Sequence, residues 1–243
     1  MDFDDKVVLV TGSSSGIGEA TALAFSEAGA TVVVNSRSSV ADGERVAAAL
    51  SKASYVQADV SDEADVARLI ATTLERHGRL DVLVNNAGTT QVIPHHDLGA
   101  AGLDVWRRIF EVNVFGTWAL TVAAMDALRE AHGAVVNVSS IAGLRPTGSS
   151  IPYATSKAAL NHLTVLLAKV VGPDVRVNAV APGLVDTPWT KDWGEIRAIV
   201  GAMAPLKRSG QPSDVAQVVV ALAAAPYVTG QVVAIDGGLT LVS

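Results

Sequence analysis

The sequence predicts one α/β domain in which a parallel sheet of about seven strands is doubly wound, with helices on both faces. Short valine-rich runs alternate with longer amphipathic segments along the whole chain. The short runs are apolar throughout, which is typical of strands buried on both faces. The 243 residues contain no internal repeat, low-complexity tract or linker, so we expect residues 1–243 to form a single domain.

The first part of the chain predicts four strands separated by three helices. In order, the patterns give strand 6–11, helix 16–29, strand 30–35, helix 40–53, strand 54–58, helix 62–78 and strand 80–85. The helix of 16–29 ends at Gly29, because glycine adopts the left-handed conformation that closes a helix. The helix of 62–78 has its apolar residues on one stripe and ends in the same way at Gly78.

The second part continues the alternation after a loop. It predicts helix 104–131, strand 134–139, helix 152–171, strand 175–181, helices 193–203 and 213–224, and a closing strand at 231–236. Glycine and serine cluster only at the turns between these elements. The carboxyl ends of the parallel strands should therefore meet at one edge of the sheet, where polar turn residues gather.

Composition excludes several classes of protein. The net charge of −6 argues against nucleic acid or an anionic membrane as the main partner. The absence of cysteine excludes disulfides, cysteine-ligated zinc and thiol nucleophiles, and fits a reducing compartment. The acidic start MDFDD does not resemble a signal peptide, and no apolar run approaches the ~18 to 20 residues of a membrane span. We expect a cytoplasmic protein.

The turn after the first strand has the composition of a phosphate-binding loop. It reads TGSSSGIG from Thr11 to Gly18 and opens the first helix. Glycine lets the backbone approach a pyrophosphate closely, and the helix start offers unpaired N–H groups and a positive dipole end. The spacing is GxxxGxG rather than GxGxxG, and no GxxxxGK[ST] motif occurs. The context predicts a dinucleotide site in a Rossmann-like fold.

The end of the second strand indicates which dinucleotide binds. A carboxylate there would hold the ribose 2′-hydroxyl of NAD, whereas this chain has Asn35, Ser36, Arg37 and Ser38. A guanidinium can grip a phosphate by two hydrogen bonds. Arg37 therefore favours NADP, as NADPH or its oxidised form, with NAD as the less favoured alternative.

Tyr153 and Lys157 stand four residues apart at the start of a helix, so they lie on the same face. Free tyrosine, with a pKa of ~10, exchanges its proton reluctantly near neutrality. A neighbouring ammonium favours the phenolate, so we expect Lys157 to lower the pKa of Tyr153 into the working range of an acid–base catalyst. Tyr and Lys residues at this spacing are common, so the pair alone does not establish a catalytic role.

The motifs together resemble those of the short-chain dehydrogenase/reductase family from residue 6 to residue 238. They are, in order, Thr11–Gly18, Asn85-Asn86-Ala87-Gly88, Ser139-Ser140, Tyr153-xxx-Lys157, Pro182-Gly183 with Thr187, and Gly230-Gln231 with Asp236-Gly237-Gly238. The resemblance implies a catalytic set of Asn113, Ser140, Tyr153 and Lys157. In it Ser140 holds the substrate oxygen, Lys157 also holds the nicotinamide ribose, and Asn113 orders a water that completes a proton relay.

The resemblance also implies the contacts of the cofactor. Asp59 and Val60 would lie at the adenine pocket, Asn86 and Gly88 at the adenosine ribose, and Thr187 at the nicotinamide carboxamide. The full expected set is Gly12, Ser14, Ser15, Gly16, Ile17, Gly18, Ser36, Arg37, Asp59, Val60, Asn86, Ala87, Gly88, Tyr153, Lys157, Pro182, Gly183, Val185 and Thr187.

Two further features of the sequence give weaker indications of function: a loop with two histidines and the segment 184–205. His95, His96 and Asp97 are adjacent in a loop and converge poorly on a metal, so we expect a solvated loop and no metal site. The family places a lid over the substrate at about 184–205. Its Trp189 and Trp193 either shape an apolar pocket or pack the lid onto the body.

Aromatic residues on more than one face of the helix of 104–131 indicate a subunit interface. They are Trp106, Phe110, Phe115 and Trp118. The resemblance implies a homodimer or homotetramer.

The leading hypothesis is an NADP(H)-dependent oxidoreductase that interconverts a ketone and a secondary alcohol, with Tyr153 as acid and base and a small molecule as substrate. The alternative is a 3-oxoacyl-carrier-protein reductase, which the mixed charge of the segment 125–133 does not favour. A dinucleotide-sensing regulator without catalysis is less favoured, because all four catalytic positions are present.

Overall fold

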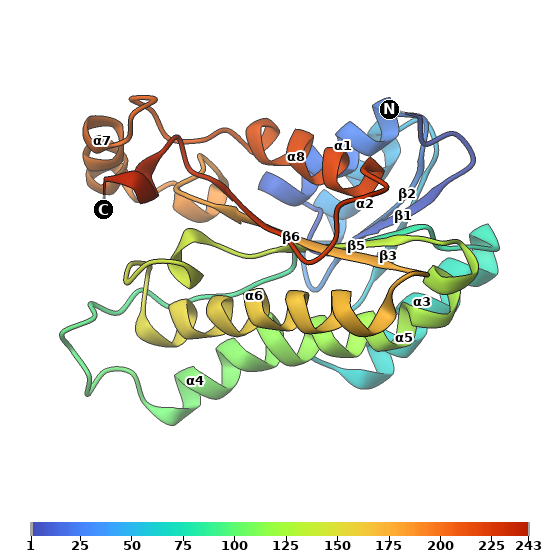
Figure 1. The fold of residues 1–243 in the computed structure, drawn as a ribbon. Helices are drawn as coiled ribbons and strands as arrows, with labels where there is room; N and C mark the ends of the chain where they lie inside the picture. The colour runs from blue at the N-terminus through green and yellow to red at the C-terminus, as the bar shows by residue number, and fades with distance from the viewer. Residues whose placement is uncertain (1, 243) are drawn as a thin grey trace.

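Residues 2–242 are described by a computed structural model, which contains one seven-stranded parallel sheet (Figure 1). The strands are β1 (Val7–Val10), β2 (Thr31–Ser36), β3 (Ala53–Gln57), β4 (Val82–Asn85), β5 (Ala134–Val138), β6 (Arg176–Pro182) and β7 (Val232–Ile235). Their order is β3-β2-β1-β4-β5-β6-β7, and every neighbouring pair is parallel. The predicted doubly wound sheet is confirmed.

Helices cover both faces of the sheet (Figure 1). One face packs against α1 (Gly16–Glu27), α2 (Val40–Ala49) and α8 (Pro212–Ala224). The other packs against α3 (Glu63–His77), α5 (Thr117–Glu130) and α6 (Ile151–Val171). Alternate residues of β1 enter the two cores: Val8 and Val10 pack in the first, and Val7 and Leu9 in the second. This two-sided burial explains why the strands are apolar throughout.

The predicted helix of 104–131 differs in detail. It consists of α4 (Leu103–Phe110), a π-helical turn η1 (Glu111–Gly116) and α5. The wider turn contains Asn113, whose side chain is fully buried and bonds to residues outside the helix. Gly116 packs so closely that a Cβ there would lie 2.6 Å from the Val60 carbonyl oxygen. π-turns of this kind are frequent at functional sites.

The helix predicted at 40–53 is too long. α2 ends at Ala49, because Leu50 is extended and Ala53 already pairs with Val32 in the sheet. The segment 184–205 holds a short 3₁₀ turn η3 (Pro188–Thr190) and α7 (Gly194–Met203). No helix within residues 2–242 has the length and apolar character needed to cross a bilayer.

Candidate active site

A large cavity of about 850 Å³ opens at the carboxyl ends of the central strands. Its walls include the turns after β1, β2, β4, β5 and β6. Strand order reverses between β1 and its neighbours β2 and β4, which is where open α/β sheets bind ligands. All nineteen residues predicted to contact the cofactor line this cavity.

The glycine turn has the geometry of a phosphate-binding loop. Gly12 and Gly16 have φ of +61° and +58°, which favour glycine. A Cβ on Gly18 would lie 2.3 Å from the Gly12 carbonyl oxygen, so no side chain fits. Ser15, the N-cap of α1, makes no side-chain capping hydrogen bond, which leaves first-turn N–H groups free for an anion. The turn therefore fits a dinucleotide pyrophosphate.

Asn86 holds this turn in place from the neighbouring strand. Its side-chain amide donates hydrogen bonds to the carbonyl oxygens of Thr11 at 2.8 Å and Gly12 at 2.9 Å. Thr11 in turn accepts hydrogen bonds from the backbone of Asn86 and Ala87. The NNAG sequence thus positions the phosphate loop as well as lining the cavity.

At the end of β2, the Ser36 side chain is buried and the next residue, Arg37, is exposed. The Ser36 hydroxyl bonds to the Ser39 carbonyl oxygen at 3.1 Å and to the Tyr55 hydroxyl at 2.9 Å, so it is already engaged within the chain. The Arg37 side chain is 66% exposed, and its guanidinium lies 3.8 Å from the Asp59 carboxylate. This long, exposed ion pair leaves the guanidinium available to a second anion.

Tyr153 and Lys157 lie on α6, whose N-cap Ser150 accepts a hydrogen bond from the Tyr153 backbone N–H. The Lys157 side chain is buried, and its Nζ donates a hydrogen bond to the Val138 carbonyl oxygen at 2.9 Å. The same nitrogen lies 5.8 Å from the centre of the Tyr153 ring. Burial lowers the pKa of Lys157 from 10.5 to about 8, because the ammonium loses hydration.

The pKa of Tyr153 moves in the direction opposite to the one expected. Burial raises it above its ordinary value, and the nearby Ser140 hydroxyl opposes this by a smaller amount. The expectation that Lys157 lowers this pKa was wrong. Its ammonium bonds to Val138 rather than to the phenol, so loss of solvent around Tyr153 dominates. The phenol therefore keeps its proton near neutrality.

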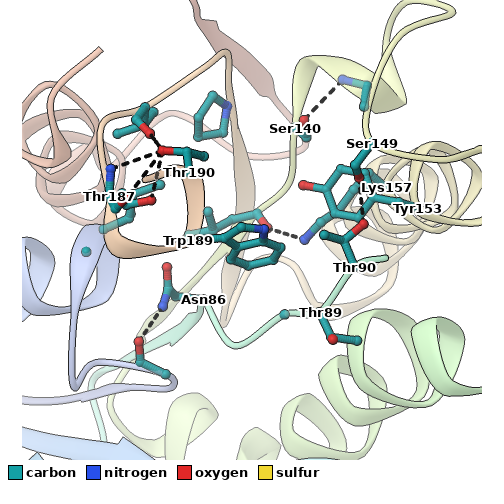
Figure 2. Close-up of a pocket in the computed structure, with 18 of the residues that line it drawn as sticks. Asn86, Thr89, Thr90, Ser140, Ser149, Tyr153, Lys157, Thr187, Trp189 and Thr190 are labelled. Carbon is teal, nitrogen blue, oxygen red and sulfur yellow. Dashed lines mark hydrogen bonds between the residues drawn. The ribbon is translucent and has the colours of Figure 1, made fainter. Parts of the chain in front are cut away.

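Ser140 stands directly after β5 and lines the cavity beside Tyr153 (Figure 2). Its hydroxyl accepts a hydrogen bond from the Ala142 backbone N–H at 3.1 Å. The donor proton of Ser140 can therefore point into the cavity, where a substrate oxygen would lie. Ser139 is buried, and its hydroxyl donates a hydrogen bond to the Lys157 carbonyl oxygen on α6.

Asn113 lies behind the cavity wall rather than in it. Its Oδ1 accepts from the Thr89 backbone N–H at 2.8 Å, and its Nδ2 donates to the Thr89 carbonyl oxygen and to the Ser156 hydroxyl, each at 3.0 Å. A Cβ on Gly88 would lie 3.4 Å from Asn113 Oδ1 and 3.7 Å from Lys157 Nζ. Asn113 thus ties the loop after β4 to α6, close to the Lys157 ammonium.

His95 corrects the expectation of a fully solvated loop. Its side chain is partly buried and lines the cavity, and within residues 2–242 its buried Nε2 has no hydrogen-bond partner. His96 and Asp97 are exposed as expected. Three or more side chains that could share a metal ion occur nowhere in the described part of the chain.

The segment 184–205 contacts the candidate catalytic residue Tyr153 through Trp189. The Trp189 ring meets the Tyr153 ring edge-on at 6.5 Å between centroids, while 47% of Trp189 stays exposed (Figure 2). Trp189 therefore both packs against Tyr153 and lines the cavity. Trp193 is partly buried and also lines the cavity. Asp186 anchors the segment by accepting hydrogen bonds from Arg197, Ser209 and Gln211.

Several cavity residues were not predicted. They are Asn35, Ser39, Thr90, Ser149 and the loop residues around His95. Thr90 follows the NNAG motif by two residues, and Ser149 precedes Tyr153 by four. Their position next to these two motifs was the only feature of the sequence that could have placed them in the cavity.

The glycine turn, the strand-end cavity and the Ser140, Tyr153 and Lys157 cluster define a nicotinamide-dependent oxidoreductase with a Rossmann-type sheet. A family model described as enoyl-(acyl carrier protein) reductase matches residues 12–240. The chain belongs to the short-chain dehydrogenase/reductase family. The family implies a nicotinamide dinucleotide cofactor and chemistry between a ketone and an alcohol.

Relatives support this assignment over the whole chain. The chain is 58% identical over 239 residues to a Streptomyces violaceoruber protein provisionally named granaticin polyketide synthase ketoacyl reductase 2, covering 97% of this chain and 96% of that protein. It is 37% identical to the 3-oxoacyl-(acyl-carrier-protein) reductase FabG of Thermotoga maritima, with 99% and 100% covered. A Burkholderia xenovorans structure provisionally titled as a short-chain dehydrogenase/reductase superimposes with a TM-score of 0.91 at 41% identity, with 97% and 98% covered.

Proposed function

We propose that the chain uses NADPH to reduce a 3-oxoacyl thioester to the 3-hydroxyacyl product, with Tyr153 as the proton donor. The observation that carries the proposal is the partly buried Tyr153 phenol, beside Ser140 and Lys157, in a cavity that continues to the glycine turn. Of the two substrate classes that the sequence leaves open, the names of the ketoacyl-reductase relatives favour this one.

The residues provide the acid–base part of the reaction. When bound, the nicotinamide would supply a hydride to the carbonyl carbon and become oxidised. Tyr153 gives its phenolic proton to the carbonyl oxygen, and the Ser140 hydroxyl donates a hydrogen bond to the same oxygen as it gains charge. The resulting phenolate is stabilised by Lys157, which lies 5.8 Å from the ring centre and, with a pKa of about 8, is mostly protonated at neutral pH.

Arg37 supports NADPH over NADH. Its exposed guanidinium lines the cavity at the end of β2, and residues 36–38 contain no carboxylate that would repel a 2′-phosphate. The Asp59 carboxylate 3.8 Å away competes for this cation. The proposal is therefore a preference for NADPH and does not require exclusion of NADH.

Exposed apolar residues on η1, α5 and α6 support assembly into a homotetramer or homodimer. Phe115, Trp118 and Val122 are each about half exposed, and Val170 is 70% exposed. A monomer would leave these large side chains in water, and a symmetric interface would bury them. The leading expectation is a tetramer.

NADPH consumption with a short 3-oxoacyl thioester tests the proposal, with NADH and simple cyclic and aromatic ketones alongside. Tyr153→Phe should reduce turnover by roughly 10²- to 10⁴-fold while the Kd for NADPH stays unchanged. Reduction of ketones without thioester turnover would leave a small-molecule carbonyl reductase. NADPH binding with no turnover of either substrate would favour a dinucleotide sensor, and full activity of Tyr153→Phe would remove Tyr153 from the mechanism.

A further inference from the structure

Two hydroxyl groups form a polar pair in the cavity wall that the catalytic chemistry does not use. Thr90 Oγ1 and Ser149 Oγ lie 2.5 Å apart, and both residues are partly buried and line the cavity. Figure 2 shows the pair beside the Tyr153 ring. The backbone next to the pair also lies close to Tyr153. A Cβ on Gly148, the residue before Ser149, would lie 3.6 Å from Tyr153 Cδ1.

The pair has one hydroxyl proton to spare. Each hydroxyl has one donor proton, and the bond between them uses one of the two. If Ser149 donates, the remaining Thr90 proton reaches only the Gln91 carbonyl oxygen, at the long distance of 3.5 Å. If Thr90 donates, the Ser149 proton has no acceptor within residues 2–242. In either case a donor remains for a ligand oxygen.

The surrounding backbone holds the pair at a fixed place relative to Tyr153. Ile93 N–H donates to the Ser149 carbonyl oxygen at 2.8 Å, and Asn113 binds both backbone groups of Thr89. Ser150, next to Ser149, caps the helix that carries Tyr153. A donor fixed in this way can select substrates by the position of a second oxygen.

We propose that Thr90 and Ser149 form a second oxygen-binding subsite, which recognises the carbonyl oxygen of the thioester while Tyr153 and Ser140 hold the oxygen being reduced. This rests on the proposed function. In a 3-oxoacyl thioester one methylene separates the two carbonyl groups, so the second oxygen lies beside the reacting one. The subsite therefore distinguishes 1,3-dicarbonyl substrates from simple ketones.

Steady-state kinetics of Thr90→Val and Ser149→Ala test the subsite. The substrates are the 3-oxobutanoyl thioester of N-acetylcysteamine and a methyl ketone of similar length without a second oxygen. For the thioester each variant should raise KM roughly 3- to 10-fold, the range of one neutral hydrogen bond, with kcat within about twofold. KM for the ketone should not change. The double variant, which keeps neither hydroxyl proton, should raise KM for the thioester at least as much as either single variant.

Thr72→Val on α3, outside the cavity, makes the same chemical change as a control and should leave both KM values unchanged. Equal effects on both substrates would show a structural role for the pair, and unchanged KM values would likewise overturn the subsite. If the wild-type chain does not turn over the thioester, the proposed function fails separately. In that case the subsite is tested by the Kd for the thioester, measured by tryptophan fluorescence. A Kd raised roughly 3- to 10-fold by Thr90→Val would support the subsite, and an unchanged Kd would contradict it.

Discussion

Lys157 should make the folded chain more stable as the pH rises from 7 to 10. Its side chain is buried, and burial lowers its pKa from 10.5 to about 8. Over this interval the unfolded chain binds the lysine proton more tightly than the folded chain does. The free energy of unfolding therefore increases with pH, and the contribution is complete only above the unfolded pKa.

The size of the effect follows from the two pKa values. At pH 7 both states hold the proton, and the folded state bears nearly the whole cost of a buried charge. At pH 10 the folded state has released the proton, while the unfolded state still holds most of it. Proton linkage with pKa values of 10.5 and about 8 gives a rise on the order of 2 to 3 kcal/mol between these pH values.

Urea unfolding at constant ionic strength, followed by circular dichroism at pH 7, 8, 9 and 10, measures this rise. Lys157→Met removes the titrating group and keeps a side chain of similar length, so the wild-type chain should gain roughly 2 to 3 kcal/mol relative to this variant across the range. Tyr153→Phe is the matched control. The raised pKa keeps Tyr153 neutral in the folded chain, and the ordinary pKa of ~10 keeps it neutral in the unfolded chain up to about pH 9, so its variant should show the wild-type rise over that range. Parallel pH curves for wild type and Lys157→Met would refute the reasoning.

Three further predictions concern the cofactor and the assembly. Arg37→Gln should reduce the preference for NADPH over NADH by about tenfold in kcat/KM, the range of one exposed charged hydrogen bond, and an unchanged ratio would exclude Arg37 from the phosphate site. Gly18→Ala should weaken NADPH binding more than tenfold, because the new Cβ would lie 2.3 Å from the Gly12 carbonyl oxygen and would displace the turn. An unaltered Kd in a calorimetric titration would contradict this. Trp118→Glu should reduce the mass in analytical ultracentrifugation, and retention of the wild-type mass would place the interface elsewhere.

The sequence could predict those parts of the site that depend on strand ends. Continuous apolar runs fix the parallel sheet, and the sheet brings the turns after β1, β4, β5 and β6 to one cavity. The glycine turn and the Tyr153–Lys157 pair are therefore visible as local patterns, because one turn of backbone sets their geometry.

Features that depend on contacts between distant segments could not be predicted in this way. The π-turn arises where the Asn113 side chain binds Thr89 and Ser156, and no local pattern in a helical segment shows such partners. The partial burial of His95 depends on how its loop folds over the cavity. The raised pKa of Tyr153 reflects the balance between burial and the hydrogen bond with Ser140, which the spacing of Tyr153 and Lys157 does not show.

The same burial acts in opposite directions on the pKa values of Tyr153 and Lys157, and under the proposed mechanism it keeps the phenol in the form that reduction uses. It raises the pKa of Tyr153 and lowers that of Lys157, because in each case the neutral form loses less hydration than the charged form. A protonated phenol is the form that reduction needs, since the carbonyl oxygen must gain a proton. Under the proposed mechanism, oxidation of an alcohol would start from the phenolate, which the burial of Tyr153 disfavours. The electrostatics of the cavity thus agree with the reductive chemistry named for the ketoacyl-reductase relatives.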